Sequence, residues 1–260
     1  MDVMALLGII CGLGMYSWGI IEGESVSAFL NAHGIVLVIG GTLFATMIYC
    51  PPGAFFDVFR AGMRIFFPAK VLSANKAVEL AVELGKKARQ SGMDSLESDV
   101  SAIKDDGFFL RTYHVCLTSA DEETARNIIE RELIQMAGRH REVLGVFRTL
   151  ASVSPMMGLM GTVIGIVSVL RNISDPSRVG ANMGVAMSTV FYGILLSGLF
   201  FNPMGGKLKS RSYLELLSKE IIMEALLTIA YSNMTPSEIE RKMVGFLKSR
   251  MIRQAVARNA

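Results

Sequence analysis

Charged side chains are scarce in this chain of 260 residues, and their absence is concentrated in four places. Asp, Glu, Lys and Arg make up 19% of the sequence, whereas soluble domains contain about 25%. The stretches 3–21, 34–50, 149–170 and 179–206 contain no Asp, Glu, Lys, Arg or His. Each stretch is near or above the length of about 20 apolar helical residues that crosses a bilayer core. The sequence therefore excludes a soluble globular enzyme and predicts an all-α, polytopic membrane protein with four transmembrane helices and a helical cytoplasmic domain.

The sequence also lacks motifs for catalysis, metal binding and nucleic-acid binding. The histidines His33, His114 and His140 are scattered, the three cysteines have no motif spacing, and no P-loop or nucleophile elbow occurs. A net charge of +3, without a basic stripe interleaved with aromatic residues, does not indicate a nucleic-acid partner. We therefore expect no enzymatic activity, no catalytic residues, no cofactor, no metal site and no nucleic-acid binding.

No ionisable side chain lies inside any of the four predicted spans. Pumps and ion-driven transporters generally place a carboxylate or a histidine within the membrane. If this chain takes part in ion conduction, then a partner helix must supply the group that titrates. The alternative is that the chain is not driven by ion flow.

The distribution of Lys and Arg predicts the orientation of the spans. The loop 22–33 contains neither residue type, and the loop between the third and fourth spans contains only Arg171 and Arg178. All other basic residues lie within 51–148 or after 206. Because basic residues next to spans stay on the cytoplasmic side, we predict that both termini are cytoplasmic and that the two short loops lie outside.

This orientation divides the chain into four segments. Residues 1–50 contain the first two transmembrane helices and a short periplasmic loop, and residues 149–206 contain the third and fourth. Residues 51–148 form a cytoplasmic helical domain, whose amphipathic first helix at 54–67 lies either in the membrane interface or against that domain. Residues 207–260 form cytoplasmic C-terminal helices and a tail.

Capping signals mark helix ends in the cytoplasmic segments. Ser73 is placed to begin a helix that runs to about Ser91, and Gly92 is placed to end it. Asp94, followed three residues later by Glu97, resembles a capping box that opens the next helix.

Two longer helices are predicted to join the cytoplasmic and membrane segments. The acidic run 121–123 favours a helix N-terminus, and the helical period after it continues into the third span. Residues 207–231 are predicted to continue the fourth span as a helix, and the cap, proline and glutamate of 235–238 are predicted to begin a last helix.

The spans contain two prolines and two hydroxyls with possible functional roles. Pro155 lies inside the third span and Pro203 near the inner end of the fourth, and each leaves a carbonyl without its helical donor. Each proline is either a tolerated kink or a hinge near a water-filled path. The hydroxyls of Thr162 and Thr189 can bond back to their own helices or serve an ion path.

Small residues in the spans favour close helix packing. Three G-x-x-x-G pairs allow two backbones to approach, either within this chain or against another subunit or partner. The pairs are Gly8 with Gly12, Gly161 with Gly165, and Gly180 with Gly184.

Several segments, in order, resemble the MotA/PomA family of larger subunits of the flagellar motor stator. The resemblance runs from Met1 to about Lys248, and the specificity comes from the order and spacing of the segments together with the topology. The segments are 36–42 (VLVIGGT), 88–97 from Ala88-Arg89 through Gly92 to Leu96-Glu97, 153–162 (VSPMMGLMGT), Tyr192-Gly193 and Asn202-Pro203.

The resemblance implies a complex in the bacterial inner membrane. Five such subunits surround two copies of a single-span partner of the MotB/PomB type, which supplies a membrane aspartate for the coupling ion. Ion flow turns the ring and produces torque on the switch protein of the rotor. The implied site residues are Thr162 and Thr189 for the ion path, Pro155 and Pro203 for torque coupling, and Arg89 and Glu97 for the rotor contact.

The coupling ion is either sodium or a proton. Thr162 matches a hydroxyl that is typical of sodium-driven members, where proton-driven members tend to have alanine. Val190 stands where sodium-driven members often carry a second threonine, and Asn31 replaces an acid that some of them have. The balance slightly favours sodium.

Two alternative functions remain open at this point. The first is an energiser of envelope transport of the ExbB/TolQ type, which also takes its aspartate from a partner but usually has three spans and an external N-terminus. The second is a structural membrane scaffold, in which Thr162 and Pro155 would matter only for stability.

Overall fold

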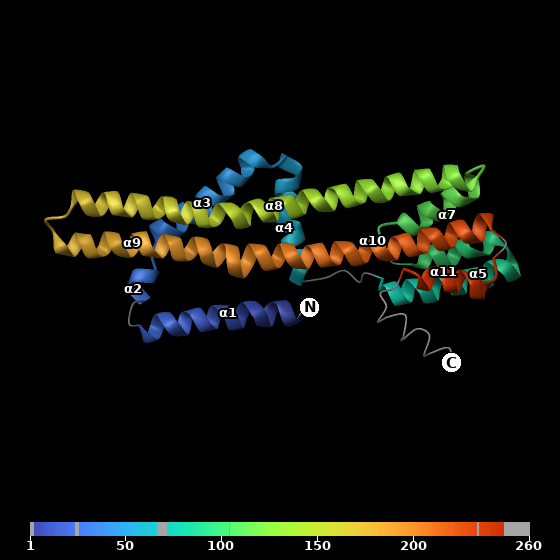
Figure 1. Cartoon of the computed structure of the whole chain (residues 1–260), viewed down its shortest axis with the longest axis horizontal. Coiled ribbons are helices and arrows are strands. Elements are labelled where there is room, and N and C mark those ends of the chain that lie inside the picture. Colours follow the sequence, from blue (N-terminus) through green and yellow to red (C-terminus); the bar gives the residue numbers. More distant parts are fainter. Residues whose placement is uncertain (1–2, 24–25, 67–71, 104, 233, 247–260) are drawn as a thin grey trace. The chain divides into compact units, whose positions relative to one another are not determined.

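The computed structural model describes residues 3–23, 26–66, 72–103, 105–232 and 234–246, and within these ranges it contains helices and turns but no strand. Four helical segments are long and apolar enough to cross a membrane, namely Val3–Glu22, Ala32–Tyr49, Glu122–Arg171 and Pro176–Tyr231. The predictions of an all-α fold and of four spans are confirmed. The helices are α1 (Val3–Glu22), α2 (Val26–Phe29), α3 (Ala32–Tyr49), α4 (Pro52–Phe66), α5 (Ala74–Ser91), α6 (Glu97–Ala102), α7 (Phe108–Thr118), α8 (Glu122–Arg171), α9 (Pro176–Leu195), α10 (Asn202–Tyr231) and α11 (Pro236–Val244) (Figure 1).

The chain forms two compact units. Residues 1–68 and 141–209 make up the first unit, and residues 69–140 and 210–260 make up the second. Helices α8 and α10 each contribute residues to both units, as expected for the predicted helices that enter and leave the membrane. The predicted domain 51–148 is divided between the two units, because α4 and the residues after 140 pack with the membrane helices.

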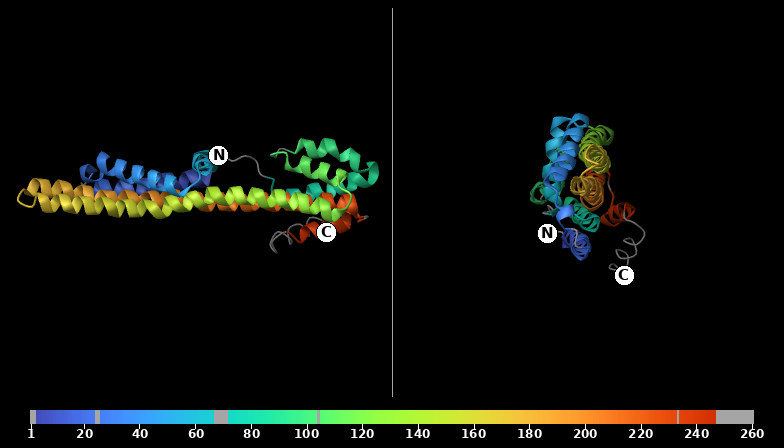
Figure 2. Two further views of the ribbon diagram at one scale, coloured as in Figure 1. Left: turned by 90° about the horizontal axis from the view of Figure 1, so that it is seen from above. Right: turned by 90° about the vertical axis from the view of Figure 1, so that its left-hand side faces the viewer.

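Helices α8 and α9 lie side by side in the first unit, and glycine makes their close approach possible (Figures 1 and 2). A Cβ on Gly158 would lie 2.7 Å from the carbonyl oxygen of Thr189, and a Cβ on Gly193 would lie 2.5 Å from that of Ser154. These distances are shorter than any real Cβ contact, so only glycine fits at either position. The two backbones are therefore in direct contact without intervening side chains.

Helix α3 packs against the same pair through small residues. Gly34 faces Thr189 and Tyr192 of α9, and Gly41 faces Met157 of α8. The Tyr192 hydroxyl donates to the Phe29 carbonyl and accepts a hydrogen bond from the Asn31 backbone N–H, at 3.0 Å. The turn that precedes α3 is thereby tied to α9.

The three G-x-x-x-G pairs do not all have the same use. Gly161 and Gly165 pack against Thr189 and Ala186 of α9, so this pair serves packing within the chain. A Cβ on Gly8 or Gly180 would meet no described atom of this chain within 4 Å. These positions are open to lipid, a neighbouring subunit or a partner.

One face of α4 packs within the first unit. Its residues Ala54, Phe55 and Val58 are buried with Val146, Phe147 and Leu150 of α8. The opposite face leaves Phe56 and Met63 63% and 65% exposed. The helix therefore combines a packed face with an apolar outer face, as an interfacial helix requires.

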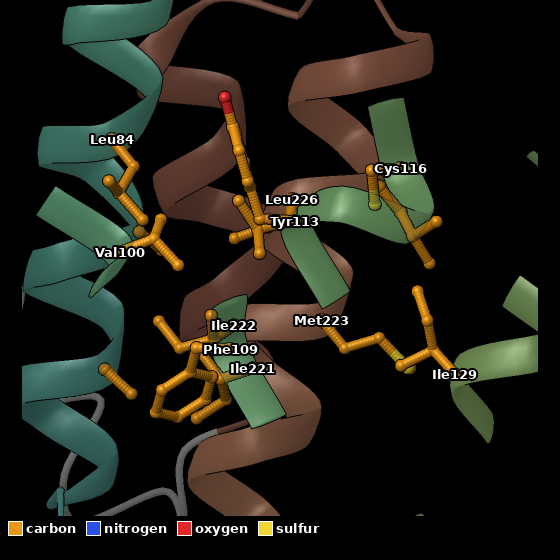
Figure 3. Packing of buried hydrophobic residues seen from close by; sticks show 14 of the residues in the cluster. Leu84, Val100, Phe109, Tyr113, Cys116, Ile129, Ile221, Ile222, Met223 and Leu226 are labelled. Carbon is orange, nitrogen blue, oxygen red and sulfur yellow. The ribbon is translucent and has the colours of Figure 1, made fainter. Parts of the chain in front are cut away.

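The second unit is built around the inner part of α10. Six apolar side chains between Ile221 and Leu227 are at most 3% exposed, so α10 is enclosed on every side. Phe109 and Tyr113 of α7 and Leu84 of α5 pack against it, and Ile129 of α8 lies beside Met223 (Figure 3). This apolar core holds α5, α7, α8, α10 and α11 together.

Most predicted helix ends in the second unit are confirmed. Ser73 accepts a hydrogen bond from the Lys76 N–H at the start of α5, and Gly92 ends that helix with φ at 82°. Asp121 accepts from the Thr124 N–H at the start of α8. Thr235 and Glu238 form the reciprocal capping box of α11.

The capping box predicted at Asp94 and Glu97 is wrong. Residues Met93–Leu96 form a 3-10 turn that runs directly into α6, and no side chain caps α6. The buried Leu96 fixes the turn against the core. Because the backbone stays helical from the turn into α6, Asp94 never takes the extended conformation that a capping residue needs.

The close contact of α8 and α9 gives a test by substitution. Gly193→Ala should destabilise the chain by about 1–3 kcal/mol, because the added methyl forces the two backbones apart. Gly180→Ala, on the same helix but in open space, should leave stability unchanged or raise it, since alanine favours helix over glycine. Thermal unfolding of the purified chain in detergent measures both. Equal behaviour of the two variants would contradict the packing.

Candidate functional site

Two threonine hydroxyls in the membrane unit converge on one carbonyl. Thr162 Oγ1 on α8 lies 3.1 Å from the carbonyl oxygen of Ala186 on α9 and 3.3 Å from that of Gly158. Thr189 Oγ1 donates to the same Ala186 carbonyl at 2.9 Å. Both hydroxyls donate to carbonyls, so the lone pairs of the half-buried Thr162 oxygen remain available for a cation or for a donor from another chain.

The two hydroxyls differ in their access to the surroundings. Thr162 is half-buried, whereas Thr189 is 1% exposed and is enclosed by Gly34 and Gly161. Both bond back to their own helices, as hydroxyls in membrane helices usually do. The bond from Thr162 to the Ala186 carbonyl crosses to the other helix, and sequence reasoning did not identify that carbonyl because every residue has one.

The two prolines lie in different backbone settings. Pro155 is inside α8 and packs beside Gly193 of α9. Pro203 is the second residue of α10 and follows the π-helical turn Leu196–Phe201. A π turn already departs from regular α-helical hydrogen bonding, so Pro203 lies at a junction rather than in a regular helix. Ser197, which the sequence analysis missed, lies in that turn and donates a hydrogen bond to the Ala151 carbonyl at 2.6 Å.

The second unit presents the two predicted rotor-facing residues at its surface. Arg89 lies in the last turn of α5 and Glu97 at the start of α6, and both are exposed. The Glu97 carboxylate is 4.0 Å from His114 Nε2. Glu97 also lines an open depression with Asp94, Ser95, Ser98, Ser101 and Leu110. An acidic, solvent-open surface of this kind suits contact with basic groups.

Two buried charge clusters link other helices of the second unit. Lys219 of α10 is 3% exposed, and its ammonium donates to Asp106 at 2.8 Å and to Glu215 at 3.0 Å. It also lies 5.5 Å from the centre of the Phe108 ring. Burial raises the pKa of Asp106, but the hydrogen bond and charge of Lys219 outweigh this effect and lower it. Lys219 therefore ties α10 to the turn before α7.

The second cluster is centred on Glu224 of α10. Its carboxylate accepts hydrogen bonds from Arg126 of α8 and lies 3.1 Å from the ammonium of Lys242 on α11. Burial raises the pKa of Glu224, but the hydrogen bonds from Arg126 and Lys242 outweigh this effect and lower it. One carboxylate thus joins three helices. The sequence signal for this residue is a single acid in the apolar run 221–227.

Comparisons with known proteins agree with this fold over almost the whole chain. The model of the MotA/TolQ/ExbB proton channel family matches residues 101–221. "Motility protein A" of Cereibacter sphaeroides is 32% identical over 257 residues, which are 98% of this chain and 100% of that protein. "Chemotaxis protein PomA" of Vibrio alginolyticus is 30% identical over 230 residues, which are 88% of this chain and 89% of that protein.

Two solved structures share the fold. The structure of the flagellar MotAB stator complex from Bacillus subtilis matches with a TM-score of 0.85 at 26% identity, over 96% of this chain and 97% of that chain. The structure of C. jejuni MotAB matches with a TM-score of 0.86 at 22% identity, over the same shares, and shows the fold alone.

The Glu224 cluster predicts a pH-dependent stability. Glu224→Gln should lower the unfolding free energy at pH 7 by about 1–3 kcal/mol, because Arg126 and Lys242 lose a buried carboxylate. The folded-state pKa lies below the ordinary value of 4.5, so this stabilisation is present above the unfolded pKa and lost as pH falls through the folded pKa. The difference between wild type and variant should therefore shrink below about pH 4.5.

A matched control is Glu130→Gln. Glu130 lies 3.8 Å from the same Arg126, but its side chain is 46% exposed. Exposed pairs contribute at most about 1 kcal/mol, so this variant should differ little from wild type. Thermal unfolding from pH 7 to about pH 3 checks both variants, and a loss in Glu130→Gln equal to that in Glu224→Gln would contradict the role of Glu224.

Proposed function

Because the chain belongs to the MotA/TolQ/ExbB proton channel family, we propose that it converts the flow of protons or sodium ions into torque on the flagellar rotor, together with a single-span partner. It is a flagellar stator ion-channel subunit. The observation that carries this conclusion is the full-length correspondence with Motility protein A, at 32% identity over 98% of the chain, in a fold shared with MotAB stator structures. The resemblance found in the sequence is confirmed.

The need for a partner follows from the chemistry of the spans. No ionisable side chain lies in the four charge-free stretches, so this chain cannot itself carry a titrating group across the membrane. The Bacillus subtilis structure that shares this fold is that of a flagellar MotAB stator complex. We infer a MotB/PomB-type partner that supplies a membrane aspartate, in a complex of five copies of this chain around two copies of the partner. Gly8 and Gly180 have no neighbouring atom within 4 Å of an added Cβ, so another helix of such a complex could pack closely at these positions.

The threonine cluster is proposed as the contribution of this chain to the ion path. Thr162, which has an exposed part, is placed to meet the partner aspartate or a bound ion. Thr189 is enclosed and holds the Ala186 carbonyl, to which Thr162 also bonds. Oxygen atoms of this kind suit a sodium ion, whereas a proton needs only the carboxylate. The cluster supports sodium, as the sequence slightly favours.

The remaining predicted site residues receive mechanical roles. Pro155 lies inside α8 and Pro203 follows the π-helical turn that precedes α10, and both are proposed to couple ion passage to movement. Arg89 and Glu97 are proposed to contact the switch protein of the rotor, because both are charged and exposed. Charged surface pairs of this kind set register and direction more than affinity.

The chain is a multi-pass membrane protein. We propose that it lies in the bacterial inner membrane with both termini cytoplasmic, which is supported by the location of nearly all basic residues in 51–148 and after 206. The family model also includes TolQ and ExbB, but the full-length relatives are motility proteins, so the envelope-energiser alternative is not favoured.

The function is tested by deletion and complementation. Cells that lack this chain and its paralogues should assemble filaments that do not rotate, because no stator is present to supply torque. Expression of the chain with its native partner should restore swimming, and expression without the partner should not. Normal swimming of the deletion strain, with no paralogue present, would contradict the proposed function.

The coupling ion is tested by swimming speed in cells that use only this stator. With pH and membrane potential held constant, speed should rise with sodium and saturate. Thr162→Ala should require more sodium for half-maximal speed, and Thr162→Ser, which keeps the hydroxyl, should lie nearer to wild type.

Ser168→Ala is the matched control for this test. Its hydroxyl lies on the same helix and donates only to the Ile164 carbonyl of that helix, at 3.0 Å. Sodium dependence should therefore remain as in wild type. A speed that is indifferent to sodium would indicate protons and would reduce Thr162 to a packing hydroxyl.

A further inference from the structure

Pro155 leaves one carbonyl of α8 without its normal partner. In a regular α-helix the N–H of residue 155 would donate to the carbonyl of Ala151, and proline has no N–H. Ala151 is 6% exposed, so the freed carbonyl is shielded within the chain. Leaving a carbonyl without a hydrogen-bond donor in the membrane costs several kcal/mol of stability. A donor from elsewhere in the chain would remove this cost.

Ser197 supplies the missing hydrogen bond from the other helix. Its Oγ donates to the Ala151 carbonyl at 2.6 Å. The short serine side chain can span the gap because Gly193, one turn earlier, brings the two backbones together beside Pro155. A Cβ on Gly193 would lie 3.1 Å from the Cα of Pro155.

Ser197 is connected at the same time to the π-helical turn that precedes Pro203. The backbone N–H of Asn202 donates to the Ser197 carbonyl, which is five residues earlier and closes the π-helical turn Leu196–Phe201. The side-chain amide of Asn202 also donates to Ser197 Oγ at 3.3 Å. Pro203 follows Asn202 directly. A continuous hydrogen-bonded path therefore runs from Asn202 through Ser197 to the carbonyl that Pro155 frees.

We propose that Ser197 is a positioning residue that joins the segment of α8 at Pro155 and the π-helical turn before Pro203 into one mechanical unit. A shift of either helix changes the same hydrogen bond, so movement at one proline is transmitted to the other. Ser197 acts through the Ala151 carbonyl and does not need to meet the ion. This inference rests on the proposed stator function for its effect on torque, but the hydrogen bond itself can be tested without motility.

The hydrogen bond is tested by a double-mutant cycle on the full-length chain purified in detergent. Ser197→Ala in the wild-type background should lower the unfolding temperature by about 2–4 °C, the shift that loss of one hydrogen bond produces in a chain of this size. In the Pro155→Ala background the restored N–H of residue 155 serves Ala151, so the same substitution should have little further effect. Equal shifts in both backgrounds would overturn the assignment.

Ser154→Ala provides the matched control. Ser154 lies beside Pro155 in the same contact and is 0% exposed, and its hydroxyl has no hydrogen-bond partner among the described residues. Its removal should not lower the unfolding temperature, since no hydrogen bond is lost. A decrease like that of Ser197→Ala would show that any small cavity in this contact has the same effect, and would overturn the assignment.

The coupling role is tested in cells that contain only this stator, with fluorescently tagged subunits to count stators at each motor. Ser197→Ala should reduce rotation speed per assembled stator with the number of stators unchanged, and Ser197→Thr, which keeps the hydroxyl, should restore speed. Loss of stators at unchanged speed per stator would indicate a merely structural role. Failure of the wild-type chain to drive rotation would instead contradict the stator function and leave the cycle in detergent as the test of the bond.

Discussion

The direct backbone contact between α8 and α9 is the constraint on which the membrane unit depends. Gly158 and Gly193 allow it, because any side chain at either position would collide with a carbonyl of the facing helix. The same approach brings Thr162 within reach of the Ala186 carbonyl and Ser197 within reach of the Ala151 carbonyl. In a bilayer, where apolar side chains gain little from leaving lipid, close packing and hydrogen bonds between helices are the available sources of association.

The membrane spans exclude charged side chains, whereas the second unit buries some of them in ion pairs. The spans contain no Asp, Glu, Lys, Arg or His, which is why the proposed function gives the ion-binding carboxylate to a partner and neutral oxygen atoms to this chain. The second unit buries Lys219 and Glu224, but each is paired with opposite charges from other helices. A buried charge that keeps its partners fixes the geometry of the helices that carry it, whereas an unpaired one would be strongly destabilising. The exposed Arg89 and Glu97 lie on the same unit, whose apolar core also includes residues of α5 and α6.

Local sequence signals gave the right answer where neighbouring residues decide the structure, and failed where the core decides it. Ser73, Gly92 and Thr235 cap their helices as predicted, because a cap needs only a few adjacent backbone groups. Asp94 and Glu97 have the same spacing as a capping box, yet the buried Leu96 holds the turn in a 3-10 conformation that continues into α6. The π-helical turn before Pro203 had no recognisable sequence signal.

The sequence by itself determined the four spans and their lack of charge, because these properties follow from hydropathy and composition along the chain. If the chain conducts ions, this lack of charge requires a partner to supply the titrating group. The sequence also placed Pro155, Pro203, Thr162 and Thr189 in those spans. Only the tertiary structure decided that both hydroxyls share the Ala186 carbonyl, that Ser197 replaces the donor that Pro155 lacks, and that Glu224 joins three helices. These contacts involve backbone carbonyls and residues far apart in sequence, and their partners are set by how the helices pack.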